Sequence, residues 1–330
     1  MSMRVFEHGD ALPPEVAGTI VTVGTFDGVH RGHLDVLARL AERAAHACQP
    51  GLLVTFEPHP LEVLNPSAAP RLLTTRAEKL LALEAAGLEY LAVVPFTAGL
   101  AQQSAQEFVE EVLRGRFRMS ELLIGHDHGF GRGREGDVES LRALGQSHGF
   151  VVDVVPPVST EGGDPISSTL VRQALLSGDL EFAASMLGRT YSVRGPVVAG
   201  EARGRTLGFP TLNVAMPAER KLLPADGVYA VIVDTEAGRH GGMLNLGGRP
   251  TFGDEMRALE AHLFDVEGDF YGQVVEVGFL TRLRETRLFG GADALRAQLV
   301  DDERAARSAL TGLASTANFK GSMHFPPSTP

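Results

Sequence analysis

The hydrophobic pattern of the chain changes once, near Gly188. From Thr19 to about Pro157, apolar runs rich in Val, Ile and Leu alternate with stretches whose apolar residues recur at helical spacing. This alternation is typical of βα units around a doubly wound parallel sheet. After Gly188 the runs become short, β-rich and separated by glycines, which predicts a small barrel or sandwich. Two domains of different architecture are therefore expected.

The expected elements follow from these periodicities. In the first part we expect strands at 19–26, 51–56, 90–95, 121–125 and 151–155, and helices beginning near Gly32, Thr75, Ser104 and Gly136 and spanning 168–178 and 179–187. In the second part we expect strands at 191–198, 228–233, 242–246, 261–266 and 274–280, and a closing amphipathic helix at 291–310. Thr75 and Ser104 each precede a glutamate by three residues, which predicts capping boxes. We predict domains at 1–187 and 188–312, followed by a disordered tail at 313–330.

Composition limits the classes of partner. Lys and Arg total 30 and Asp and Glu total 41, a formal charge of −11, which disfavours broad binding to nucleic acid or anionic membranes. Any phosphate site must then be compact. The single cysteine, Cys48, excludes an intramolecular disulfide and any multi-cysteine zinc module. With no apolar signal-peptide core and no apolar run near membrane length, we expect a cytoplasmic protein without membrane partners. A weak homo-oligomer is left open.

Residues 24–33 read GTFDGVHRGH and run from an apolar strand into a helix. Parallel sheets bind ligands at the carboxyl ends of their strands, where helix N-termini attract anions. His30 and His33 bracket Gly32, so both imidazoles are expected to face a polyphosphate that the backbone approaches closely. The alternative is a surface turn with incidental histidines. A metal pair is disfavoured, because no further ligands stand at a recognisable spacing.

A second glycine motif lies at 131–136, GRGREG, between an expected strand and an expected helix. It satisfies G-x-G-x-x-G and on its own would indicate a dinucleotide-binding oxidoreductase. Two arginines occupy a turn that usually admits only small groups near a pyrophosphate. We interpret the segment as a flexible, basic active-site loop.

The first half carries motifs of a known superfamily. Residues 24–33 resemble the nucleotidyltransferase signature G-x-F-D-x-x-H-x-G-H, and 166–172, ISSTLVR, resemble its second phosphate-binding motif. Residues 55–60, TFEPHP, resemble a landmark near the nucleotide and flavin pocket. The resemblance implies phosphate contacts from Gly24, Phe26, Asp27, His30, Gly32, His33, Ser167, Ser168, Thr169 and Arg172, with Phe56 and His59 on the flavin side.

The second half has no P-loop, so ordinary P-loop phosphoryl transfer is excluded. The riboflavin kinase signature instead resembles residues 195–213, which read GPVVAGEARGRTLGFPTLN. The alternative is a glycine-rich hairpin between strands with no binding role. The resemblance implies that Thr211 and Asn213 hold Mg²⁺ and ATP phosphates, as neutral oxygen ligands suit a hard cation. It places Gly204, Arg205 and Gly208 in the loop over the nucleotide.

Three later segments extend the match: 245–252 (NLGGRPTF), 259–265 (LEAHLFD) and 283–289 (LRETRLF). They resemble the kinase family's N-x-G-x-R-P-T-F segment, its E-x-H-L strand and its flavin-side loop. The resemblance implies that Glu260 is the general base and that Arg284 and Glu285 lie beside the flavin.

Both halves, in this order, resemble the bifunctional prokaryotic riboflavin kinase/FAD synthetase family. The resemblance implies a nucleotidyltransferase-like, Rossmann-like sheet followed by a smaller β-barrel with a C-terminal helix. It implies that riboflavin and ATP give FMN in the second domain, and that FMN and ATP give FAD and pyrophosphate in the first, with Mg²⁺. A ribityl hydroxyl needs a positioned base, whereas the phosphate of FMN is already an anion.

One segment departs from that family. Residues 125–131 read GHDHGFG where the family usually has G-x-[DN]-F-x-F-G. Asp127 keeps the polar position on the flavin side, but His128 replaces a phenylalanine and Gly129 a polar residue. The first alternative is therefore a riboflavin kinase with an impaired adenylyltransferase half. Two further alternatives stay open independently of this segment: a flavin-responsive binding protein without turnover and, more distantly, a dinucleotide-binding oxidoreductase.

Overall fold

The computed structural model describes residues 3–126, 129–200, 203–217, 220–249 and 254–315. Its contacts divide the chain into two compact units, Met1–Ser167 and Ser168–Pro330. Helices α6 (Ser168–Ser177) and α7 (Leu180–Leu187) belong to the second unit, where α7 packs on the barrel strands. The division by contacts thus falls at 167/168. The domain boundary predicted from the sequence, at 187/188, stays a prediction.

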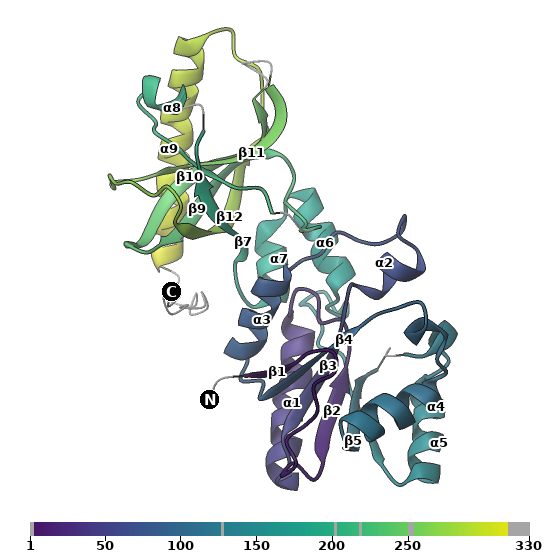
Figure 1. The fold of residues 1–330 in the computed structure, drawn as a ribbon. Coiled ribbons are helices and arrows are strands. Elements are labelled where there is room, and N and C mark those ends of the chain that lie inside the picture. The colour runs from purple at the N-terminus through teal and green to yellow at the C-terminus, as the bar shows by residue number, and fades with distance from the viewer. Residues whose placement is uncertain (1–2, 127–128, 201–202, 218–219, 250–253, 316–330) are drawn as a thin grey trace. The chain divides into compact units, whose positions relative to one another are not determined.

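The first unit is built on a six-stranded, fully parallel sheet (Figure 1). Its strands are β1 (Arg4–Phe6), β2 (Thr19–Val23), β3 (Gly51–Glu57), β4 (Tyr90–Pro95), β5 (Met119–Gly125) and β6 (Val151–Val155), in the spatial order β1-β4-β3-β2-β5-β6. From β2 the chain proceeds through β3 and β4 on one side and then crosses to β5 and β6 on the other. The order therefore reverses between β2 and β5, where open α/β sheets bind ligands.

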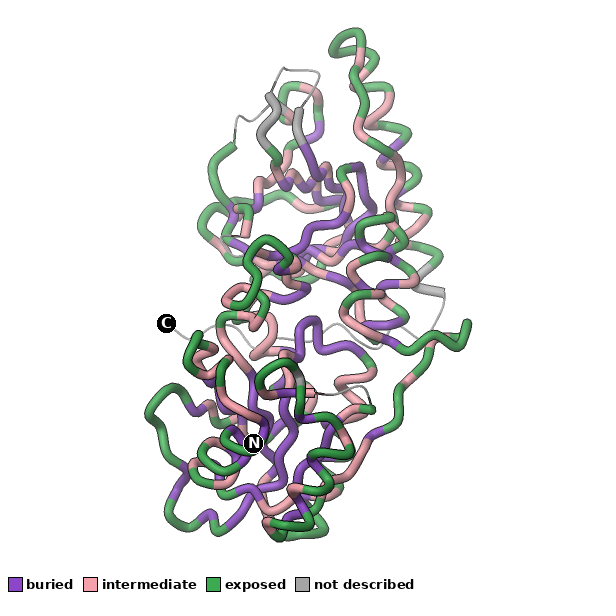
Figure 2. Tube along the Cα trace, turned by 90° about the vertical axis from the view of Figure 1, so that its right-hand side faces the viewer, coloured by how far each residue is buried: buried purple, intermediate pink, exposed green. Residues whose placement is uncertain are grey.

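Helices connect these strands. They are α1 (Arg31–Ala47), α2 (Pro60–Leu64), α3 (Arg76–Ala85), α4 (Ala105–Glu107) and α5 (Val138–His148), with a π-helix at Phe108–Arg116 and short 3₁₀ turns at Leu100–Gln102 and Arg132–Arg134. All five residues of β2 are buried, as expected of a strand covered on both faces. Figure 2 shows buried stretches of the chain on the inside, with exposed stretches around them. Both predicted capping boxes, at Thr75 and Ser104, are confirmed.

The second unit is a closed antiparallel barrel with strands in the order β10-β11-β8-β7-β12-β9. These are β7 (Tyr191–Val198), β8 (Leu212–Val214), β9 (Gly227–Thr235), β10 (Gly238–Arg249), β11 (Asp254–Leu263) and β12 (Val274–Arg284), with helices α8 (Arg203–Thr206) and α9 (Ala292–Ser315). The predicted fold class, a Rossmann-like sheet followed by a barrel and a C-terminal helix, is confirmed. Within the described residues, no helix has the length and apolar character needed to cross a membrane.

Candidate active sites

The loop at residues 24–30 leaves the carboxyl end of β2, beside the point where the strand order reverses. Phe26, Gly28 and Val29 have φ angles of 48°, 84° and 40°. A left-handed conformation is unfavourable for a β-branched residue such as Val29, and such strain is concentrated at functional sites. The loop thus has a fixed, irregular backbone at the position where a ligand is expected.

His30 is the N-cap of α1 and is only 4% exposed. Its Nδ1 accepts a hydrogen bond from the backbone N–H of His33 at 3.3 Å, so a neutral His30 carries its proton on Nε2. The two imidazoles stack with centroids 3.7 Å apart, and Phe26 stacks on His33 at 4.4 Å. The three predicted residues therefore form one column of rings.

Gly32 permits two close approaches within the first unit. A Cβ at this position would lie 3.2 Å from the ring of His30 and 3.5 Å from the carbonyl oxygen of Ile166. The absence of a side chain therefore lets the start of α1 pack against the residue before Ser167. This packing brings the end of the first unit next to the histidine motif.

Asp27 is engaged inside the protein. Its carboxylate is 4% exposed and accepts hydrogen bonds from the backbone N–H groups of Leu73 and Thr74 and from the Thr74 hydroxyl, at 2.9–3.2 Å. The Gly28 N–H also donates to the Thr74 hydroxyl at 3.2 Å. These bonds give Asp27 an anchoring contact between the loop and the segment before α3.

The other residues predicted for the adenylyl-transfer site lie on several elements. Gly24 donates its N–H to the Val54 carbonyl at 3.0 Å, and Phe56 contacts the rings of Phe96 and Phe108. His59 caps α2, accepting the Leu61 N–H at 3.2 Å. Ser167 ends the first unit, whereas Ser168, Thr169 and Arg172 lie on the first turns of α6 in the second. Asp127 and His128 lie outside the described residues.

The G-x-G-x-x-G segment closes on itself. The Gly136 N–H donates to the Phe130 carbonyl at 3.0 Å, and these two residues form an antiparallel bridge. A Cβ at Gly131 would lie 2.6 Å from the backbone nitrogen of Ala105, and one at Gly136 would lie 2.7 Å from the Ala105 Cβ. Close packing against the start of α4 therefore accounts for both glycines without a bound dinucleotide.

In the second unit, three polar side chains form a row across adjacent strands. Glu260 on β11 lies opposite Asn213 on β8 and opposite Asn245 on β10. Directly opposed residues of antiparallel strands point to the same face, with Cβ atoms about 5 Å apart. The neighbours Leu259 and Ala261 are fully buried on the other face, inside the barrel. The Asn213–Glu260–Asn245 row is thus on the outer face. The motif N-x-G signalled Asn245, but sequence reasoning gave that residue no role.

The glycine-rich loop before β8 lies close to this row. A Cβ at Gly200 would lie 2.0 Å from Asn213 Nδ2, and one at Gly204 would lie 3.3 Å from the Thr211 hydroxyl and 2.3 Å from the Phe209 carbonyl. A side chain at Gly200 would therefore displace the Asn213 amide, and one at Gly204 would clash with the backbone that leads to Thr211.

The turn before Thr211 is held by His262. A carbonyl can only accept, so His262 Nδ1 donates to the Pro210 carbonyl at 2.7 Å. In the same loop Gly208 has a φ of 87°, which favours glycine, and Arg205 is exposed.

Arg284, predicted to lie beside the flavin, makes an ion pair within the protein. Its guanidinium binds both carboxylate oxygens of Asp302 on α9, at 2.8 Å from Nε and 2.7 Å from Nη2. Glu285 is 84% exposed at its side chain. The structure therefore places these neighbours in different environments, one fixed against α9 and one open to solvent.

The comparisons with known proteins match both halves. A family model described as FAD synthetase matches residues 12–170, and one described as riboflavin kinase matches 187–310. The bifunctional riboflavin kinase/FMN adenylyltransferase of Escherichia coli K12 is 40% identical over 88% of this chain and 92% of its own length. That of Pseudomonas fluorescens is 39% identical over 90% and 94%. The chain therefore belongs to the bifunctional riboflavin kinase/FMN adenylyltransferase family.

A solved structure is similar to this chain over nearly its whole length. A protein from Streptococcus pneumoniae, described as a macrolide-efflux protein, superposes with a TM-score of 0.82 at 33% identity, covering 92% of this chain and 98% of its own. Family membership confirms the recognition made from the sequence. It also favours adenylyl and phosphoryl transfer over the oxidoreductase alternative, in agreement with the closed glycine loop.

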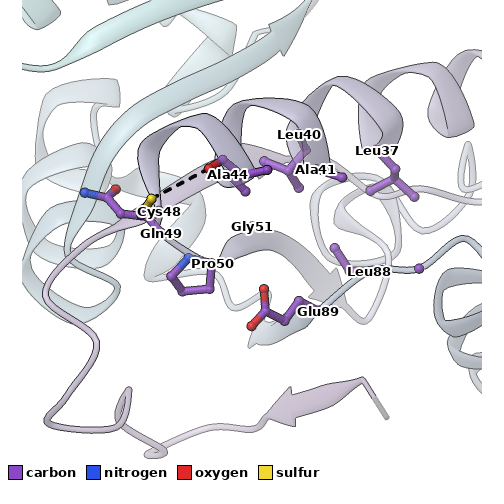
Figure 3. Close-up of a pocket in the computed structure, with 12 residues that line it drawn as sticks. Leu37, Leu40, Ala41, Ala44, Cys48, Gln49, Pro50, Gly51, Leu88 and Glu89 are labelled. Atoms are coloured by element: carbon purple, nitrogen blue, oxygen red, sulfur yellow. Dashed lines mark hydrogen bonds between the residues drawn. The ribbon is translucent and has the colours of Figure 1, made fainter. Parts of the chain in front are cut away.

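A cavity of about 450 Å³ lies away from the histidine motif (Figure 3). It is lined by the last turns of α1, by Cys48 and by residues just before β3 and β4, including Pro50 and Glu89. These are the amino ends of the strands, whereas His30 follows the carboxyl end of β2. The cavity is therefore separate from the candidate nucleotide site.

Proposed function

We propose that this chain phosphorylates riboflavin to FMN in its second domain and adenylylates FMN to FAD in its first, using ATP in both. The observation that carries the proposal is the difference between the two candidate sites. On the barrel, the Glu260 carboxylate lies between the amides of Asn213 and Asn245. In the first unit, His30 and His33 lie at the N-terminus of α1, which His30 caps. The former suits a hydroxyl nucleophile, and the latter suits a substrate that is already an anion.

In the kinase reaction, Glu260 takes the proton of the terminal ribityl hydroxyl as its oxygen attacks the γ-phosphorus of ATP. The bond from that phosphorus to the bridging oxygen breaks, and ADP leaves. General-base catalysis of this kind contributes about 10²–10⁴-fold. Gly204, Arg205 and Gly208 belong to the loop that covers the nucleotide.

Thr211 and Asn213 are the residues that would hold Mg²⁺. Their side-chain oxygens are neutral, and ATP phosphates would supply further ligands to a hard cation. The close approach of Gly200 and Gly204 to Asn213 and Thr211 fits such a cradle. Mg²⁺ would neutralise the charge that develops on the transferred phosphoryl group.

In the adenylyl transfer, an oxygen of the FMN phosphate attacks the α-phosphorus of ATP, and pyrophosphate leaves. His30, through its Nε2–H, and His33 donate hydrogen bonds to phosphate oxygens. Positioning and charge stabilisation carry this reaction, because its nucleophile needs no base. Within the first unit, the resemblance to the family predicts further phosphate contacts from Gly24, Phe26, Gly32 and Ser167. Ser168, Thr169 and Arg172 of the second unit stay predictions from the same motif. Asp27 anchors the loop, and Phe56 and His59 are assigned to the flavin side.

The two half-reactions are distinguished by their products from ATP. With riboflavin as the starting flavin, ADP should form first and pyrophosphate should follow as FMN accumulates. With FMN as the starting flavin, pyrophosphate should form without ADP. Formation of ADP from FMN, or the absence of ADP when riboflavin is supplied, would contradict the proposal. Absence of pyrophosphate from both starts would instead support the alternative with an impaired adenylyltransferase half.

We also propose the cellular setting from sequence composition. A single cysteine fits a reducing cytoplasm, and a net charge of −11 argues against nucleic-acid or anionic-membrane partners. The partners are then the small molecules riboflavin, FMN and ATP.

The domain boundary at 187/188 follows α7, whose C-cap is the left-handed Gly188.

A further inference from the structure

The carboxylate of Asp302 is the most deeply buried acid of α9. Its side chain is 3% exposed and accepts from Arg284 Nε at 2.8 Å, from Arg284 Nη2 at 2.7 Å and from Gln298 Nε2 at 2.8 Å. Arg284 is the last residue of β12, and Gln298 is one helical turn before Asp302. One face of α9 therefore binds the end of β12, where the predicted flavin-side segment, residues 283–289, begins.

The same helix face also holds the middle of that segment. Gln298 Oε1 accepts a hydrogen bond from Arg287, and the guanidinium groups of Arg284 and Arg287 lie 5.5 Å and 5.0 Å from the ring centroid of Phe289. Arg284 Nη1 additionally donates to the Glu285 carbonyl at 2.9 Å. Asp302 and Gln298 thus fix the path of the whole segment through its two arginines.

The barrel register relates this segment to the polar row. Arg284 pairs with Val228 on β9, and Val228 pairs with Asn245 on β10, next to Glu260. Neighbouring strands are about 4.8 Å apart, so the start of the segment is two strands from Asn245. Asn213 and the glycine-rich loop lie on the opposite side of Glu260. The two sides of the row can therefore respond separately to substitutions.

We propose that Asp302 and Gln298 are positioning residues that set the affinity of the kinase site for riboflavin through the segment 283–289. They act on the flavin side and leave the ATP side unchanged. The inference rests on the proposed kinase function and on the flavin-side position of the segment. Neither Asp302 nor Gln298 needs to touch the substrate.

The direct test is Asp302→Asn, which keeps the shape of the side chain but removes the charge that Arg284 binds bidentately. A buried arginine deprived of its partner is costly, so the segment is expected to leave its native path. We expect the KM for riboflavin to rise about tenfold, with the KM for ATP changed less than twofold. Arg284→Lys should behave similarly, because an ammonium cannot reproduce the paired geometry.

The adjacent Asp301 offers a matched control. Its side chain is 62% exposed and pairs across one helical turn with Arg304, which is 75% exposed. Asp301→Asn removes the same charge from the same helix and should leave both KM values unchanged. The rate of FMN adenylylation, measured on the same preparations, reports whether the first domain is intact.

A folded Asp302→Asn protein with unchanged riboflavin KM would overturn the proposal, as would a parallel rise in both KM values. If that variant does not fold, as judged by its circular dichroism melt, Gln298→Ala decides instead. It removes the Arg287 contact without burying a lone charge, and should raise the riboflavin KM by a smaller factor with the ATP KM unchanged. Failure of wild-type protein to make FMN would contradict the kinase function itself, which keeps the two failures distinct.

Discussion

The two candidate sites differ in the kind of backbone that carries them. In the first unit, the histidines follow a loop with three left-handed residues at the end of a parallel strand. In the barrel, Asn213, Glu260 and Asn245 lie on three regular strands and are aligned by hydrogen-bonded register. Under the proposed function, the loop places the imidazoles at a helix N-terminus for an anion, whereas the strands hold the proposed base, Glu260, in register with its neighbours.

This difference matches the nucleophile that each site is proposed to use. A hydroxyl must lose a proton during attack, so its site contains a carboxylate. A phosphate monoester is already charged at neutral pH, so donors suffice. Substitutions that affect only one of the two reactions can therefore break or sharpen the comparison.

The largest effect is expected for Glu260→Gln. The amide keeps the size of the side chain but cannot accept the ribityl proton, so the rate of FMN formation should fall about 10²–10⁴-fold. Adenylylation of supplied FMN should be unchanged. Initial rates of FMN and FAD formation, each measured with its own substrate, test this; equal loss of both would refute the assignment of separate sites.

The next effect concerns His30, where two variants separate capping from chemistry. His30→Asn retains an N-cap acceptor for the His33 N–H but removes the imidazole, whereas His30→Ala removes both. Each should lower FAD formation about 10²-fold or more and let FMN accumulate. Only His30→Ala should also lose about 1 kcal/mol of stability. Unchanged FAD output from folded His30→Asn would remove His30 from the site.

A smaller effect is expected for Gly200→Ala. The added methyl group would lie 2.0 Å from Asn213 Nδ2, so the amide must move away from its predicted ligand position. We expect about a tenfold rise in the KM for ATP in the kinase reaction and no change in adenylylation. Gly291→Ala is a suitable control, because a Cβ there meets open space. Equal behaviour of the two variants would argue against the cradle.

The smallest effect involves pH and the helix caps of the first unit. The Ser140 backbone N–H donates to Asp137 and lowers the pKa of that carboxyl, and the Ser104 backbone N–H does the same for Glu107. A lowered folded-state pKa means that the stabilisation is present at neutral pH and is lost as the pH falls through the folded-state pKa, which lies below the ordinary value of each carboxyl.

Asp137→Ala should therefore melt a few degrees below wild type at pH 7, with the gap narrowing in strongly acidic buffer. Asp137→Asn, which keeps a capping acceptor, should show a smaller gap at pH 7. Circular dichroism melts across this range would check the sign. A gap that widens on acidification would contradict the assigned cause.

Much of the fold could be predicted from the hydrophobic periodicity. The predicted strands at 90–95, 151–155 and 191–198 coincide with β4, β6 and β7, because each is an apolar or alternating run with clear breaks. Strands β1 and β8 were missed, since three residues are too few to show a period. The choice between barrel and sandwich depends on closure, which local patterns do not reveal.

The site was predictable to a lesser extent, because its decisive contacts link residues that are distant in the sequence. Asp27 binds residues 46 and 47 positions away, and Asp302 binds Arg284 on another element. The motif indicated Asp27 and Arg284 but not these partners. Capping by His30 also escaped prediction, since histidine is not among the usual N-cap residues.

The central claim is that one chain carries two separate working sites, and chromatography of the flavins formed by the wild-type protein tests it most directly. One reaction starts from riboflavin, ATP and Mg²⁺, and a parallel reaction starts from FMN. The account predicts FMN and then FAD in the first, and FAD in the second. FMN without FAD from riboflavin, together with no FAD from FMN, would contradict it and leave a riboflavin kinase with an impaired adenylyltransferase half.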